Sequence, residues 1–229
     1  MKIILGLLSF LGLATCVITS PRRRSMARWH LEQVKHLSYQ QWLDCLLCLL
    51  QLSVLFSLIL IFPSQIRISD AFHFLQLIEW HWQIICYALL YIIALVEITL
   101  LVLIALFDVT LKKDSRTLFK KMNWLAYRPE KPKLSFFVLS FVCLSDALVY
   151  LGVLLFLAKT SPVNLIALIL GYAFVKACRY TVWSHRLLAF CLFAVIAIWC
   201  ITACLLYGWG IGLFLLTMTY LLISFKEQH

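Results

Sequence analysis

Two acidic residues, Glu97 and Asp146, lie inside long apolar stretches of the sequence. A carboxylate is costly in hydrocarbon, so acids in such stretches usually face the interior of a helix bundle and mark a functional site. Both lie about ten residues, or about 15 Å, from the ends of their apolar segments on one side of the membrane. We therefore predict an intramembrane polar site of Glu97 and Asp146, with Ser145, Tyr91 and Tyr150 as neighbours.

The chemistry of such a site follows from its low dielectric. Two carboxyl groups at one depth do not both ionise easily, so one of them would hold a proton and could exchange it or bind a cation. That chemistry suits a transporter or channel. The alternative is structural, because a protonated acid that is hydrogen-bonded to a neighbouring helix holds the bundle together. The sequence leaves both roles open.

The overall composition indicates what kind of fold contains these acidic residues. Hydrophobic residues make up 64% of the 229 residues, charged residues make up 13%, and the mean hydropathy is +0.97. These values exclude a soluble fold. A helix needs about 20 apolar residues to cross a bilayer, so the chain has room for about seven spans and for no sizeable domain outside them.

The apolar segments predict an all-α, polytopic transmembrane helix bundle that forms a single domain over residues 1–229. The fifth segment is short and contains Lys176, which indicates a tilted or partly buried helix. The last two segments form one uncharged run that is too long for a single span, so we expect it to turn back at residues 207–210. The seven predicted spans are residues 3–19, 42–62, 83–107, 135–158, 163–178, 187–206 and 209–225.

The basic residues predict the orientation, because short loops rich in Lys and Arg stay on the cytoplasmic side. With seven spans, nearly all of the 20 Lys and Arg residues fall on one side. The bias predicts an outside N-terminus and an inside C-terminus. We expect the membrane to be a bacterial inner membrane or a eukaryotic endomembrane.

The N-terminus has a second interpretation. Residues 1–20 resemble a secretory signal peptide, and Leu13 to Cys16 resemble a lipidation signal with a threonine in place of the usual small residue. Cleavage would leave six spans and would put the basic connections on the translocated side, against the charge rule.

Two basic segments border the apolar ones. The first, residues 21–41, mixes cations with aromatic and aliphatic residues, as an interfacial helix on anionic lipid headgroups would. The second, residues 108–134, is predicted to be a cytoplasmic loop. It could bind a protein partner, or its charges could only fix the orientation of the chain in the membrane. Because the cations cluster beside apolar segments, we expect no nucleic-acid binding. The predicted contact residues are Arg22, Arg23, Arg24, Arg28, Lys112, Lys113, Lys120 and Lys121.

The remaining polar residues and cysteines give weaker indications of function. Lys176 and Arg179 lie near a predicted membrane boundary, where long side chains reach water, so we expect anchoring. Cys45 and Cys48 have the spacing of a redox or metal pair, but no second pair completes a zinc site, so we expect packing residues. No nucleotide, metal, cofactor or catalytic motif is found, and none is predicted.

Three classes of function remain open. A small transporter or channel would use a proton- or cation-linked site at Glu97 and Asp146. A non-enzymatic membrane subunit of a secretion, assembly or exclusion system would instead bind a partner through residues 108–134 or an exposed helix face. An intramembrane enzyme would need a catalytic set that the sequence does not display.

Overall fold

The computed structural model describes residues 2–20, 30, 37–61, 82–110, 112, 114–115 and 132–226. Their regular secondary structure is entirely helical. The elements are α1 (Lys2–Ile18), α3 (Tyr39–Ile61), α5 (Trp82–Ala105), η1 (Leu106–Thr110), α7 (Pro132–Asp146), η2 (Ala147–Leu154), α8 (Leu155–Ala158), α9 (Pro162–Ala177), α10 (Trp183–Tyr207) and α11 (Trp209–Lys226).

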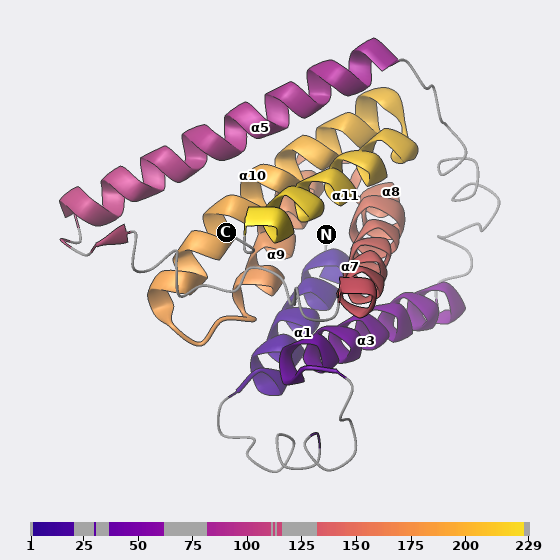
Figure 1. Cartoon of the computed structure of the whole chain (residues 1–229). Coiled ribbons are helices and arrows are strands. Elements are labelled where there is room, and N and C mark those ends of the chain that lie inside the picture. Colours follow the sequence, from indigo (N-terminus) through magenta and orange to yellow (C-terminus); the bar gives the residue numbers. More distant parts are fainter. Residues whose placement is uncertain are drawn as a thin grey trace.

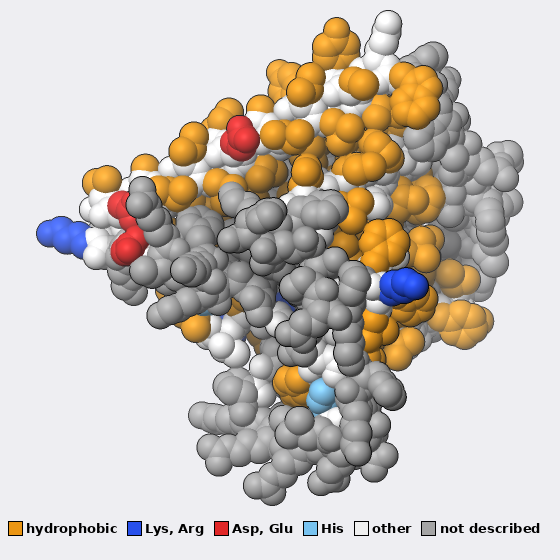
Figure 2. Space-filling model, viewed as in Figure 1, with side chains coloured by type: hydrophobic (Ala, Val, Ile, Leu, Met, Phe, Trp, Pro, Cys, Tyr) orange, Lys and Arg blue, Asp and Glu red, His pale blue; other side chains and the backbone are white. Residues whose placement is uncertain are grey.

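The described helices confirm the prediction of an all-α fold, and their apolar character is compatible with a multi-pass membrane protein. Among the described residues, four helices are long and apolar enough to cross a bilayer, namely Tyr39–Leu60, Trp82–Val109, Lys133–Ala158 and Trp183–Tyr207. Three shorter apolar helices, Ile4–Ile18, Pro162–Ala177 and Trp209–Ser224, occupy the remaining predicted segments. The space-filling view shows hydrophobic side chains over much of the described surface, as lipid contact requires (Figure 2).

Helix α10 lies at the centre of the bundle. It packs against α9, α11 and α5, and its buried side chains include Leu188, Leu192, Ile196 and Cys200 at helical spacing. Helix α3 packs against α7, and the Gln41 Nε2 donates a hydrogen bond to the Ser135 Oγ at 2.9 Å between them. Helix α5 runs along the outside of α10 (Figure 1).

Helix α1 is part of the core. It packs against α9, with Leu8 and Leu11 almost fully buried. Small residues allow the close approach, because an added Cβ would lie 2.6 Å from the Phe174 ring at Gly12 and would overlap the Leu8 side chain at Gly171. The N-terminal segment therefore supplies part of the wall around the interior polar residues.

The turn between α10 and α11 confirms the predicted corner. Helix α10 ends at Tyr207, α11 begins at Trp209, and Gly208 between them has φ 93°. A side chain is strained in this left-handed region, whereas glycine adopts it readily. The long uncharged run is thereby folded into a helical hairpin.

Gly212 lies where the packing of this hairpin can be tested by substitution. An added Cβ would overlap the Cys204 Sγ and lie 3.1 Å from the Cys200 carbonyl oxygen. We expect Gly212→Ala to lower the free energy of unfolding by about 1–3 kcal/mol, the usual cost of overpacking. Unfolding in mixed detergent micelles would measure it.

Two variants control this experiment. Adding Cys204→Ala removes the clashing sulfur and should restore much of the loss. Gly6→Ala is the matched control, because no atom lies within 4 Å of the added Cβ there. Equal losses at Gly6 and Gly212 would contradict the packing explanation.

A π-helical segment interrupts the third long span. Element η2 begins directly after Asp146 and continues the chain of α7 into α8. Its wider turns replace the usual backbone hydrogen bonds, and such segments occur frequently at functional sites. The Trp209 indole Nε1 donates a hydrogen bond to the Ala147 carbonyl at 3.4 Å, which ties this segment to the start of α11.

Most of the predicted basic surface lies outside the described residues. This holds for Lys113, Lys120 and Lys121 of the 108–134 segment, whereas Lys112 is described and exposed. It also holds for Arg22, Arg23, Arg24 and Arg28 of the 21–41 segment.

Candidate functional site

Asp146 lies at the centre of the candidate site. It is the last residue of α7 and is fully buried. Its Oδ2 atom forms an ion pair with the Lys176 Nζ of α9 and accepts a hydrogen bond from the Tyr220 hydroxyl of α11 at 2.5 Å. A single carboxyl oxygen thus joins three helices. Buried charges are tolerated when they are paired and hydrogen-bonded in this way.

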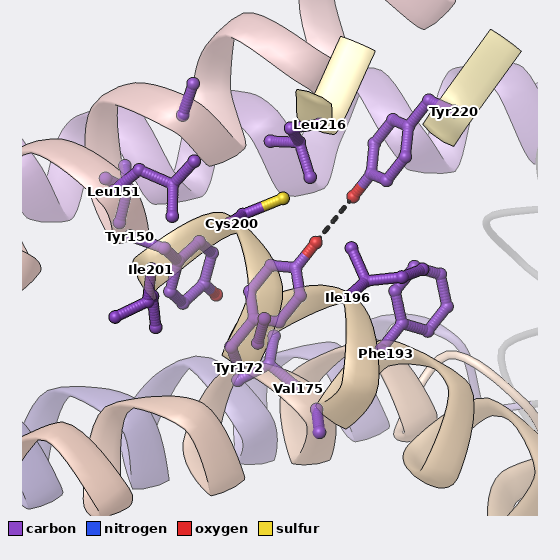
Figure 3. Packing of buried hydrophobic residues seen from close by; sticks show 14 of the residues in the cluster. Tyr150, Leu151, Tyr172, Val175, Phe193, Ile196, Cys200, Ile201, Leu216 and Tyr220 are labelled. Atoms are coloured by element: carbon purple, nitrogen blue, oxygen red, sulfur yellow. Dashed lines mark hydrogen bonds between the residues drawn. The ribbon is translucent and has the colours of Figure 1, made fainter. Parts of the chain in front are cut away.

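Two tyrosines extend the site beyond the carboxylate. The Tyr172 and Tyr220 hydroxyl oxygens lie 2.8 Å apart and point toward each other (Figure 3). Because Tyr220 donates its one proton to Asp146, Tyr172 donates to Tyr220. The Lys176 Nζ lies 5.7 Å from the centre of each tyrosine ring. This separation is within the range of a cation–π interaction, so both rings help to stabilise the ammonium group.

A second hydrogen-bonded group lies beside Asp146. The Ser145 Oγ donates to the Gln51 Oε1 of α3 at 2.9 Å, and the Gln51 Nε2 donates to the Tyr150 hydroxyl at 3.4 Å. The rings of Tyr150 and Tyr172 meet edge to face with their centres 4.8 Å apart. These contacts connect α3 to the polar side chains around Asp146.

A second ion pair lies toward one end of the bundle. The Arg179 guanidinium, just after α9, donates to the Asp44 Oδ2 of α3 at 2.8 Å. Both side chains are largely buried, at 14% and 8% exposure. The two ion pairs balance in charge, since each buried acid faces one base.

Two small cavities border the Asp146–Lys176 pair. One, of about 40 Å³, is lined mostly by apolar residues, together with the polar side chains of Asp44, Gln51, Lys176 and Arg179. The other, of about 10 Å³, is lined by Asp146 together with Tyr150 and Tyr172 among mostly apolar residues. The ion pair therefore lies between a larger cavity on the lysine side and a smaller one on the aspartate side.

The second oxygen of Asp146 is unusual. Oδ1 is buried and has no hydrogen-bond partner among the described residues. An unpartnered buried oxygen costs free energy unless a proton or a water satisfies it. The adjacent cavity of about 10 Å³ is near the minimum that one water needs. Oδ1 is thus a buried acceptor of the site that no described residue satisfies.

The structure brings together only part of the predicted site. Asp146, Ser145 and Tyr150 lie together and are buried, as a shared polar site requires. Glu97 is exposed on α5, and Tyr91 is 62% exposed and stacks on Trp199 at the bundle surface. Equal depth does not specify which face of a helix turns inward, and α5 turns its aliphatic face toward α10. The predicted pairing of Glu97 with Asp146 is therefore replaced by the pairing of Asp146 with Lys176.

The predicted roles of Lys176 and Arg179 also need correction. The sequence predicts anchors that reach water, but each of these bases forms an ion pair with a buried acid. The turn between α8 and α9 explains the Lys176 contact. Asp146 lies nearly as far before that turn as Lys176 lies after it, so an antiparallel hairpin places the two residues at one depth.

Sequence reasoning missed four residues of the site. They are Asp44, Gln51, Tyr172 and Tyr220. Two signals could have identified the tyrosines. Tyr172 precedes Lys176 by one helical turn, and Tyr220 follows the Gly208 corner by about three helical turns, which places it at the depth of Asp146. Asp44 and Arg179 lie near the ends of predicted segments that face one side of the membrane.

The cysteines form no disulfide, and the cysteines and histidines form no metal-binding group, in the described part of the chain. All nine cysteines are free, and Cys48 of the Cys45–Cys48 pair is buried. No group of three or more His, Cys, Asp or Glu residues that could hold a metal ion occurs among the described residues.

The described part of the chain is an all-helical bundle with four candidate membrane-spanning helices and two largely buried ion pairs, Asp146–Lys176 and Asp44–Arg179. The chain belongs to the family of unknown function DUF5968, which matches residues 85–227 and so more than half of the chain. The match includes Asp146, Lys176 and Tyr220, whereas Asp44 and Gln51 precede it. No curated protein and no solved structure matches the chain.

Proposed function

We propose that this protein is a small transporter or channel with a proton-linked site at Asp146. The observation that carries the proposal is the state of this one carboxyl group. One oxygen is paired with Lys176 and Tyr220, and the other is buried and unpartnered among the described residues. Asp146 also lines a small cavity. Ionisable residues in membrane spans commonly form proton relays in pumps and transporters.

The geometry supports a proton more than a metal cation. Lys176 and Arg179 line the larger cavity and are paired with Asp146 and Asp44, so neither acid is free to bind a metal cation there. A proton added to Asp146 Oδ1 would neutralise the carboxylate and weaken its attraction for Lys176. Because Lys176 lines the larger cavity, proton binding on one side would change the charge balance on the other. This is the coupling that a proton-linked transporter needs.

The orientation and lipid contacts belong to the same proposal. With an outside N-terminus and an inside C-terminus, most cations lie on the cytoplasmic side, where anionic headgroups attract Lys and Arg. The membrane is then a bacterial inner membrane or a eukaryotic endomembrane.

Proton flux tests the proposal. Purified protein in liposomes with a trapped pH-sensitive dye would be exposed to a pH gradient, with and without a mixture of small solutes outside. We expect proton movement above that of protein-free liposomes. Asp146→Asn should reduce it at least tenfold, and Glu97→Gln, the same change at an exposed acid, should leave it within about twofold.

A second variant separates loss of function from loss of fold. Asp146→Asn combined with Lys176→Gln removes both charges, so the bundle should regain stability while the proton site stays absent. This double variant should be folded and inactive. A folded double variant with wild-type flux, or a wild-type protein without proton movement under any condition, would contradict the proposal.

A further inference from the structure

The outer face of α5 carries an acid that the bundle does not partner. Glu97 is exposed near the middle of the Trp82–Val109 span, and Leu90 and Leu101 are each 65% exposed beside it. The opposite face of the helix, with Ile85 and Ile92, is buried against the bundle. Figure 2 shows this side of the molecule as mainly hydrophobic with isolated acidic side chains.

An exposed carboxyl group at this depth needs a hydrogen-bond partner. Acids in membrane spans almost always face protein or water-filled cavities, because hydrocarbon cannot solvate them. Glu97 has no hydrogen bond or ion pair with any described residue. Lys176 in α9 and Arg179 just after it are already paired with Asp146 and Asp44. The partner must therefore come from outside the described chain.

We propose that α5 of a second copy of this chain covers this face in a parallel dimer. A second copy has the same orientation in the membrane, so its Glu97 lies at the same depth. One protonated carboxyl group can donate a hydrogen bond to the other, which makes the acid self-complementary across a two-fold axis. The two Glu97 carboxyl groups then satisfy each other, so no different protein is needed as a partner.

The spacing along α5 fits a helix-helix seam. Leu90 and Glu97 are seven residues apart, as are Ala94 and Leu101, and all four are exposed. These are the alternating three- and four-residue steps of paired helices. The small Ala94 allows close approach of the two backbones next to the carboxyl groups, and a single polar position in such a seam fixes the register.

Cys86 provides a direct test of this arrangement. It precedes Glu97 by about three helical turns, so it lies on the same side of α5. Its thiol is free and exposed. A parallel two-fold dimer places the two Cys86 residues at one depth along the edge of this seam. We expect copper phenanthroline to cross-link the protein in liposomes at low protein density, and Cys86→Ser to abolish the cross-link.

Glu97 variants test the cause of the association. Glu97→Gln keeps a side chain that donates and accepts, so cross-linking should stay within about twofold of wild type. Glu97→Leu should reduce it at least tenfold while leaving a monodisperse protein, because leucine suits a lipid-facing position. Unchanged cross-linking in Glu97→Leu would overturn the proposal.

A cysteine-independent count completes the test. Single-molecule photobleaching of labelled protein in liposomes should show two steps for wild type and Glu97→Gln, and one step for Glu97→Leu. Purified wild-type protein that bleaches in one step would overturn the dimer and assign the face to a different partner helix. None of these outcomes depends on proton flux.

Discussion

Replacing Asp146 with asparagine is expected to lower the free energy of unfolding by about 3–5 kcal/mol, the usual cost of removing one partner of a buried ion pair. The variant leaves the Lys176 ammonium in the bundle interior with only 15% exposure and without its counter-charge. It also weakens the hydrogen bond from Tyr220. Unfolding by denaturing detergent in mixed micelles would measure the loss, with the folded yield as a second readout.

The double variant gives the sharper result. Adding Lys176→Gln removes the unpaired charge, so much of the stability lost in Asp146→Asn should return. Glu97→Gln is the matched control, because it makes the same chemical change at an exposed acid and should cost little. A double variant as unstable as the sum of its two single variants would show that Asp146 and Lys176 do not interact.

The second large effect is expected for Tyr220→Phe. The change removes only a hydroxyl oxygen, yet that oxygen donates to Asp146 at 2.5 Å and accepts from Tyr172 at 2.8 Å. A hydrogen bond to a charged group contributes about 1.5–3 kcal/mol and a neutral one about 1 kcal/mol. We expect Tyr220→Phe to lower the free energy of unfolding by about 3 kcal/mol, the sum of these two contributions.

Tyr172→Phe is the matched control for this prediction. Tyr172 lies at the outer end of the same hydroxyl chain, so its removal breaks one neutral hydrogen bond and leaves the Tyr220–Asp146 bond intact. We expect a loss of about 1 kcal/mol. The ratio between the two tyrosines is the informative quantity, measured by the same detergent titration. Equal losses would mean that Tyr220 does not donate to Asp146.

Few substitutions should be tolerated at the buried contacts of Asp146, Lys176 and Tyr220. Asp146 and Lys176 come from helices α7 and α9, and Tyr220 comes from α11, so one substitution removes contacts among three helices at once. The adjacent cavities, of about 10 Å³ and about 40 Å³, are small. They offer little room for water to replace a lost partner. Stability and proton flux are therefore best measured on the same variants.

Local sequence determined the class and the segments of this protein. Hydropathy sums over neighbouring residues, so the apolar runs predict the helices and the Gly208 corner without knowledge of their contacts. Asp146 is also found in this way, because an acid in an apolar run is costly in hydrocarbon and so marks a candidate site. Its neighbours Ser145 and Tyr150 follow from sequence proximity.

The tertiary structure alone decided which charges meet. Depth along a helix can be counted from the sequence, but the rotation of each helix about its axis depends on how it packs. Glu97 and Asp146 have similar predicted depths, yet α5 turns Glu97 outward and α7 turns Asp146 inward. The partner of Asp146 is Lys176 because the α8–α9 hairpin sets these two residues at one level. Which charged side chains pair depends on helix packing, and hydropathy and charge counts give no information about that packing.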